Sequence, residues 1–361
     1  MKLSRHVLLC ALVLVLLTSA AVADDLGDRI DAAAREQMKS QKLVGLAVGV
    51  IENREIVHLQ GYGYADLDKQ VPVDPRKTMF RWASISKPLT AVAATQLWEV
   101  KKLDLDADVR GLVPEFPDKG KTITMRQLLG HFGGIVHYKN GKVIRTRREY
   151  DAEHPHADVI LALDVFKESP LVSEPGKEMN YTTHGYILAS AVVQRAGGEP
   201  YHQQVNRRIA EPLGMKTLQP DYPWVDIPDR AVGYRKPKKA SKEKTVHWKL
   251  GGGGFISTVE DLALFAEGLL DGKLVSDRGY ELMWTESSEP GGERTGYGLG
   301  FGVGGEGKSR QVAHTGSQNK TRTVMVIFPE TGRGVVAMTN SEYAKIQDLA
   351  RALLGAMGPI E

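Results

Sequence analysis

The sequence contains very little cysteine and no excess of charge of one sign. Only one cysteine, Cys10, occurs in the 361 residues, so disulfides, a thiol nucleophile and cysteine zinc sites are excluded beyond that position. Lys and Arg number 47 and Asp and Glu number 44, which leaves a formal charge of +3. Such a balanced charge argues against nucleic acid as a partner.

Long hydrophobic runs are confined to the start of the chain. The basic residues Lys2 and Arg5 precede an apolar run at 7–17, and Ala-Val-Ala at 21–23 matches a signal-peptidase site. We therefore predict that residues 1–23 are a signal peptide and that the protein is secreted or periplasmic. An uncleaved membrane anchor is the alternative, although the run is short for a spanning helix. We expect no membrane span in the mature chain.

Two pairs of β-rich segments predict hairpins. Residues 43–51 and 55–64 are separated by the turn at 52–54, and residues 324–328 and 334–338 are joined by a second turn. Strands that are joined by tight turns form antiparallel sheets.

Helical spacing of apolar residues occurs at 30–41, at 84–100 and near the end of the chain. Ser341 is expected to cap the last helix, which places Ile346 and Leu349 on one buried face.

These elements predict an α/β (α+β) fold with an antiparallel sheet flanked by helices. Residues 24–361 are expected to form one domain, in which about 24–100 and 246–361 make the α/β lobe. Residues from about 101 to 245 make a second, mainly helical lobe. A small-molecule site is expected in the cleft between the lobes.

One motif imitates a nucleotide site. Residues 302–309 read G-V-G-G-E-G-K-S, the pattern of a phosphate-binding loop. That loop works only between a strand and a helix, whereas residues 310–314 have the pattern of a strand. We therefore predict a glycine-rich hairpin tip and no nucleotide.

Metal-binding patterns are also incomplete. Asp104, Asp106 and Asp108 alternate like the ligands of a calcium loop, but Val109 occupies the position that needs glycine. No H-E-x-x-H occurs. We expect neither a metal nor another cofactor.

A possible nucleophile lies in the S-x-x-K motif of Ser84 and Lys87. At the start of a helix, residues three apart share a face, so the lysine amine can reach the serine hydroxyl. A serine hydroxyl needs such a base, and lysine can serve when burial keeps it neutral. A capping serine beside a solvated lysine is the structural alternative.

Two further motifs follow in the chain. Residues 175–186 place Tyr181 on a loop before a helix, and His314, Thr315 and Gly316 form H-T-G on a strand. No G-x-S-x-G occurs, so a nucleophile-elbow hydrolase is excluded.

These three elements, in this order, resemble the serine β-lactamase and penicillin-binding-protein superfamily, in particular its class C and esterase-like branch. Residues 251–262 and 297–301 also resemble stretches of that branch, and the resemblance covers about 27–355. Within the branch, the stretch H-F-G-G-I-V-H-Y at 131–138 looks most like the mitochondrial β-lactamase-like protein of animals and its bacterial relatives.

The resemblance implies an acyl-enzyme mechanism. Ser84 would attack a carbonyl, Lys87 would take its proton, and Tyr181 would carry protons to the leaving group. The backbone N–H groups of Ser84 and Ser317 would form the oxyanion hole. His314, Thr315 and Gly316, which directly precede Ser317, would line the edge of the site that orients the substrate.

Two residues depart from the family pattern. Thr183 replaces the usual Asn of Y-x-N, and it offers one hydroxyl on a shorter side chain. His314 replaces the common Lys of K-T-G, for which we expect a pH-dependent charge.

The function implied is that of an exported serine hydrolase acting on a small-molecule or peptide-like acyl substrate. Esterase, D-amino-acid peptidase and weak β-lactamase activities all remain open, as does the oligomeric state. The alternative from another class is a catalytically weak binding or self-assembling scaffold that retains the fold.

Overall fold

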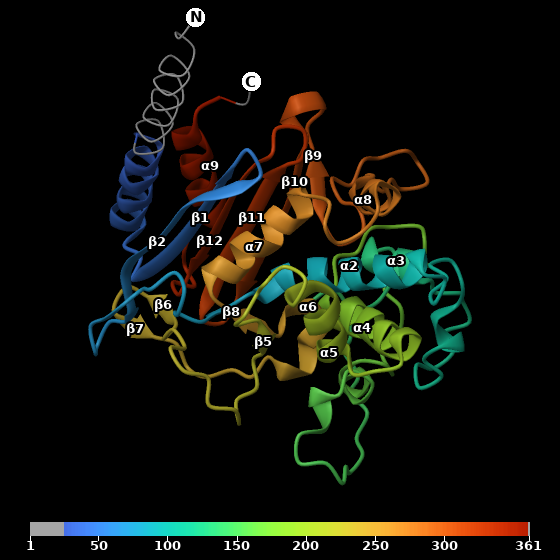
Figure 1. The fold of residues 1–361 in the computed structure, drawn as a ribbon. Coiled ribbons are helices and arrows are strands. Elements are labelled where there is room, and N and C mark those ends of the chain that lie inside the picture. The colour runs from blue at the N-terminus through green and yellow to red at the C-terminus, as the bar shows by residue number, and fades with distance from the viewer. Residues whose placement is uncertain (1–24, 360–361) are drawn as a thin grey trace, which may run out of the picture.

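The computed structural model describes residues 25–359, and the predicted signal peptide and Cys10 lie outside this part of the chain. A seven-stranded antiparallel sheet dominates it, with the strand order β3-β2-β1-β12-β11-β10-β9 (Figure 1). Its strands are β1 (Gly45–Glu52), β2 (Glu55–Asp66), β3 (Val71–Pro72), β9 (Gly302–Gly304), β10 (Gln311–Gln318), β11 (Thr321–Phe328) and β12 (Arg333–Thr339).

The two predicted hairpins are confirmed as β1–β2 and β11–β12. At the first turn Asn53 and Arg54 have φ angles of 52° and 66°, so both adopt the left-handed conformation that suits a two-residue hairpin. Strand β1 also pairs with β12, with Leu46 opposite Thr339. The first and last strands of the chain therefore lie side by side at the centre of the sheet.

Helices cover both faces of the sheet. Alternate residues of β1, Leu46 and Val48, pack with the helix over residues 25–41 and with α9 (Ile346–Met357). On the opposite face, β1 packs against α7 (Val259–Leu270). The period of two in a strand thus divides its side chains between two apolar layers.

The predicted cap of the last helix is wrong. Helix α9 begins after Lys345, which makes no side-chain cap. The Ser341 hydroxyl instead accepts a hydrogen bond from the backbone N–H of Val44 at 3.0 Å. Ser341 therefore lies before the helix, and its hydroxyl makes a tertiary contact with the residue directly before β1 in place of a helix cap.

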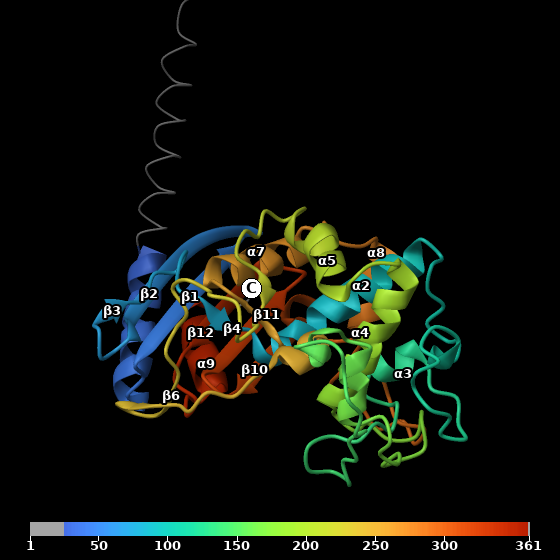
Figure 2. The same ribbon diagram turned by 90° about the horizontal axis from the view of Figure 1, so that it is seen from below.

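The remaining helices gather beside the sheet, as Figure 2 shows from below. Helix α2 packs against α4, α5, α6 and α8, and α3 packs against α4. These helices are α2 (Ser86–Glu99), α3 (Met125–Leu129), α4 (Thr183–Gly197), α5 (Tyr201–Val205), α6 (Leu250–Gly253) and α8 (Asp277–Trp284). Two small sheets, of β4 (Phe80–Arg81), β8 (Phe255–Ser257) and β5 (Gln219–Pro220) and of β6 (Tyr234–Lys236) and β7 (Lys239–Ala240), complete the fold.

The phosphate-loop imitation is part of a hairpin. Strand β9 pairs antiparallel with the start of β10, and only the short turn Gly307–Ser309 lies between them. A strand and not a helix follows the glycines, as predicted. Within residues 25–359 we find no cluster of ligands suited to a metal ion, and none of the helices there has the length and apolar character needed to cross a membrane.

Candidate active site

Ser84 lies in the single 3-10 turn η1 (Ala83–Ile85), directly before helix α2. Two hydrogen bonds fix the residue that precedes this turn. The N–H of Trp82 donates to Phe255 O at 2.9 Å, and the Thr323 hydroxyl donates to Trp82 O at 2.9 Å. Ala83 has a φ angle of 50°, in the left-handed region that a residue with a side chain adopts only at a cost. The surrounding strands thus hold Ser84 on a constrained turn at a helix N-terminus.

Gly316 allows strand β10 to approach this turn. A Cβ at position 316 would lie 2.0 Å from the Thr323 hydroxyl oxygen and 2.5 Å from Trp82 O. Any side chain would therefore push the strand away from η1. The H-T-G segment is thus brought against the turn that carries Ser84, and the exposed Ser317 follows it along the strand.

Lys87 is completely buried, one helical turn after Ser84. Its Nζ lies 3.2 Å from Ser84 Oγ, 2.9 Å from Gly252 O and 3.4 Å from Thr183 Oγ1. Within residues 25–359 no carboxylate pairs with this amine, and burial lowers its pKa to about 7. Near neutral pH a substantial fraction of Lys87 is therefore uncharged.

The three contacts match the bonding capacity of a neutral amine. Its two N–H groups can donate to Gly252 O and to Thr183 Oγ1, which leaves the lone pair for the hydroxyl hydrogen of Ser84. The arrangement therefore suits a base that removes the proton of Ser84.

Tyr181 lies on the loop before α4, and the residues on either side of it in the sequence are hydrogen-bonded to His131. The N–H of Asn180 donates to His131 O at 2.8 Å, and the N–H of Thr182 donates to His131 Nδ1 at 3.2 Å. His131 itself is buried and has a φ angle of 68°. The H-F-G-G loop thus acts as a support that positions the tyrosine.

The Tyr181 ring lies close to both other residues of the predicted triplet. Lys87 Nζ is 4.8 Å from the ring centroid. Burial raises the pKa of Tyr181 to about 12, and a hydrogen bond with Ser84 opposes this effect only in part. The phenol is therefore protonated at neutral pH and can donate a proton. The structure brings Ser84, Lys87, Tyr181 and Thr183 together.

The carbonyl of Gly252 is a contact that sequence reasoning missed. The four glycines at 251–254 belong to a stretch that resembles the family, and they are closely packed. A Cβ at Gly252 would lie 2.7 Å from Thr183 Cγ2. What the sequence does not reveal is that this close approach aims a backbone carbonyl at Lys87.

His314 does not provide the expected pH-dependent charge near neutral pH. Its Nδ1–H donates to Thr315 O at 2.8 Å, and its Nε2 accepts from the Tyr297 hydroxyl at 3.0 Å. Burial, with repulsion from Lys87, lowers the pKa of His314 to about 3. Both ring nitrogens are thus occupied within the protein, and the imidazole is neutral. Tyr297 belongs to the Y-G-L-G-F stretch, whose contact with His314 no sequence signal indicated.

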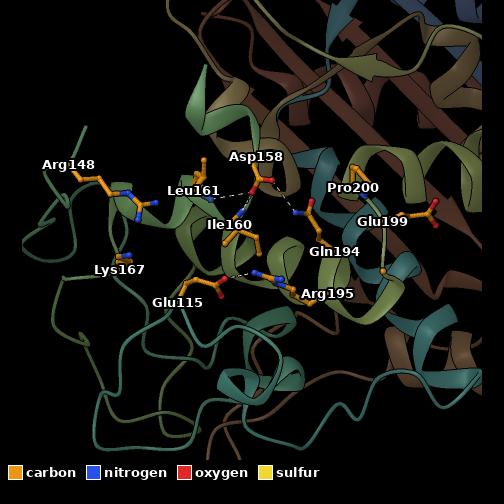
Figure 3. A pocket seen from close by; sticks show the side chains of 11 residues that line it. Glu115, Arg148, Asp158, Ile160, Leu161, Lys167, Gln194, Arg195, Glu199 and Pro200 are labelled. Carbon is orange, nitrogen blue, oxygen red and sulfur yellow. Dashed lines mark hydrogen bonds and ion pairs between the residues drawn. The ribbon is translucent and has the colours of Figure 1, made fainter. Parts of the chain in front are cut away.

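A pocket of about 660 Å³ lies elsewhere, beside the C-terminal end of α4 (Figure 3). It contains none of the predicted site residues. Among its lining residues Arg195 forms an ion pair with Glu115, and the Gln194 amide donates to Asp158. This pocket therefore lacks the serine, lysine and tyrosine of the candidate active site.

The comparisons with known proteins identify the family. The family model described as Beta-lactamase matches residues 30–356. The mouse serine beta-lactamase-like protein LACTB, mitochondrial, is 31% identical over 384 residues, which cover 79% of this chain and 69% of the mouse protein. The resemblance to the mitochondrial β-lactamase-like protein is thus confirmed.

Two solved structures share the fold. EstCE1, described as a hydrolase with promiscuous acyltransferase activity, gives a TM-score of 0.78 at 21% identity, covering 94% of this chain and 100% of that chain. The D-amino acid amidase from Ochrobactrum anthropi SV3 gives 0.74 at 22% identity, covering 92% and 99%. At these identities the likeness concerns the fold. The match of the family model and the identity to the mouse protein show that this chain belongs to the Beta-lactamase family.

Proposed function

We propose that this protein is a serine hydrolase that forms an acyl-enzyme on Ser84 and prefers esters to amides and β-lactams. The observation that carries the proposal is the buried, unpaired amine of Lys87, 3.2 Å from Ser84 Oγ and with a pKa lowered to about 7. A structural lysine has no need to be held neutral beside a hydroxyl. A general base is most effective when its pKa lies near the working pH.

The acylation step balances with these residues alone. As Ser84 Oγ attacks the substrate carbonyl, its proton passes to the Lys87 lone pair, and a tetrahedral oxyanion forms. Collapse of this intermediate breaks the bond to the leaving group. The Tyr181 phenol donates its proton to the departing oxygen or nitrogen and regains one from the Lys87 ammonium. Water then attacks the acyl-enzyme carbonyl and gives its proton to the neutral Lys87. The second tetrahedral intermediate collapses, the bond to Ser84 Oγ breaks, and Oγ takes this proton from Lys87 as the acid leaves.

Thr183 supports the preference for esters. Its hydroxyl, on a short side chain, lies 3.4 Å from Lys87 Nζ, and the residue is buried. The Asn of the family pattern would offer a second donor to a substrate carbonyl. One missing hydrogen bond costs about 1–3 kcal/mol, which is roughly one to two powers of ten in rate. An ester tolerates this loss better, because an alkoxide leaves more readily than an amine.

The experiment is a comparison of kcat/KM for phenyl hexanoate, for its anilide and for a cephalosporin. We expect turnover of the ester to be fastest. Faster hydrolysis of the cephalosporin than of the ester would contradict the proposed preference.

Replacing Thr183 by asparagine is expected to raise the amide-to-ester ratio of kcat/KM about tenfold, because the longer side chain restores the missing donor. Thr183→Ser keeps only the hydroxyl and serves as the control, with a ratio close to that of the wild type. An unchanged ratio in Thr183→Asn would show that this position does not set the preference.

We also propose that the protein is exported. The support is the basic start, the apolar run and the Ala-Val-Ala sequence within residues 1–23. N-terminal sequencing of the protein from a cell envelope or medium tests this, and a chain that begins at Asp24 is the expected result.

A further inference from the structure

Lys249 is a second lysine near the site for which the mechanism has no use. It ends the 3-10 turn η6 (His247–Lys249), directly before helix α6, whose Gly252 carbonyl binds Lys87. Its side chain is largely buried, but its ammonium, which has no hydrogen-bond partner within residues 25–359, is not fully buried. Lys249 thus presents its charge from a wall of the site while it keeps contact with solvent.

Two aromatic rings lie beside the ammonium of Lys249. It lies 5.8 Å from the ring centroid of Tyr138 and 5.9 Å from that of Trp248. Throughout residues 25–359 it forms no ion pair and no side-chain hydrogen bond. The face of an aromatic ring attracts a cation, but it leaves the three N–H donors of a lysine free. Lys249 therefore has the bonding capacity to hold an anion.

The titratable and charged groups around Lys249 are positive or neutral. Lys87 on α2 and Arg81 on β4 repel it, and together with burial they lower its pKa to about 7. His137, on the loop at 131–138, and His184, on α4, are neutral, because burial lowers the pKa of each to about 4. No carboxylate opposes Lys249 from any of these elements.

Arg81 does not compete for the same anion. Its guanidinium is buried and donates to Asp221 Oδ2 at 2.5 Å and to Glu243 Oε1 at 2.9 Å. The fork of Arg81 is therefore occupied within the protein, whereas Lys249 is free. His314, on β10, is neutral and bonded at both ring nitrogens, so the H-T-G strand does not supply a cation either.

We propose that Lys249 binds a carboxylate of the substrate, so that the natural substrates are esters or amides that carry a free carboxylate. This inference rests on the proposed function, because it names the substrate class of the same site. A bound carboxylate would pair with this ammonium, which makes no ion pair within residues 25–359, and would keep it protonated. A charged hydrogen bond of this kind contributes about 10- to 100-fold in affinity.

Binding to the Ser84→Ala protein tests the inference without turnover. Calorimetry compares three matched amides: hexananilide, which is neutral; N-phenyladipamic acid, with a carboxylate on the acyl side; and 3-hexanamidobenzoic acid, with a carboxylate on the amine side. We expect at least one of the two acids to bind tenfold or more tightly than hexananilide. The acid that does so identifies the side of the scissile bond that faces Lys249.

Variants then assign the preference to the residue. Lys249→Met, added to Ser84→Ala, should remove the preference for the acid and leave the binding of hexananilide unchanged. Lys249→Arg should retain it. Lys139→Met removes an exposed charge close to Tyr138 and should also retain it.

The inference is overturned if neither acid binds more tightly than hexananilide, if no ligand binds, or if the preference survives in Lys249→Met. Hydrolysis of phenyl hexanoate by the wild type is measured in parallel. Turnover without a preference for acids leaves the proposed function intact and rejects the role of Lys249. A preference for acids that depends on Lys249, without any turnover of phenyl hexanoate, supports the role of Lys249 and rejects the proposed function.

Discussion

Replacing Ser84 by alanine is expected to lower kcat/KM for phenyl hexanoate by at least about 10³-fold. Ser84 supplies the only atom that bonds to the substrate in our mechanism, and removal of a serine nucleophile leaves only binding and oxyanion stabilisation. Alanine removes only the hydroxyl, whose hydrogen-bond partners within residues 25–359 are Lys87 and Tyr181. The melting temperature should therefore change little.

Ser317→Ala is the matched control for this prediction. Ser317 lies on the adjoining strand with an exposed side chain, and its proposed role uses the backbone N–H, which alanine retains. We expect its rate to stay within tenfold of the wild type. Equal losses in both variants, or a folded Ser84→Ala protein with more than a tenth of the wild-type rate, would contradict the assignment of the nucleophile.

Replacing Lys87 by methionine is expected to lower kcat/KM by about 10²-fold or more, the usual effect of losing a general base. Only the neutral amine accepts the proton of Ser84. The wild-type rate should therefore rise as pH increases through about 7, the pKa to which burial lowers Lys87. The pH profile of the methionine variant should lack this rise.

The control for Lys87 separates a base from a structural contact. Lys87→Arg keeps a donor for the Gly252 carbonyl but cannot lose its proton at working pH, so it should be as inactive as Lys87→Met. Tyr181→Phe leaves Lys87 in place and should keep the rise near pH 7 at a lower rate. An active arginine variant would show that Lys87 has a structural role.

The stability of Lys87→Met provides an independent check. Unfolded lysine is protonated below about pH 10.5, whereas folded Lys87 is protonated only below about 7. Unfolding therefore takes up a proton between these values, and stability rises with pH across that window. The cost of the buried charge is greatest below pH 7. The methionine variant should thus melt no lower than the wild type at pH 6.

Local patterns were sufficient to predict the elements that build the frame of the site. Apolar, β-rich segments separated by short turns predicted both hairpins, and the S-x-x-K spacing placed Lys87 one turn after Ser84. Both signals depend on residues close together in the sequence. Ser341 shows the limit of such signals, because its hydroxyl binds the backbone of Val44, almost three hundred residues away.

The electrostatic character of the site could not be predicted from the sequence. Whether His314 is charged depends on Tyr297 and on burial, and whether Lys87 is neutral depends on the absence of a nearby carboxylate. Each is a property of several segments packed together. The same holds for Lys249, which the sequence shows only as one more basic residue near a glycine run. A motif identifies the reacting groups, but their protonation states require the fold.

Covalent labelling is the measurement that tests the central claim most directly. The wild-type protein is treated with a fluorophosphonate, digested and analysed by mass spectrometry, with Lys87→Met treated in parallel. The account predicts a single adduct on Ser84, formed at least about 10²-fold more slowly in the methionine variant. An adduct on Ser86 or Ser317, or labelling of Ser84 at the same rate without Lys87, would contradict it.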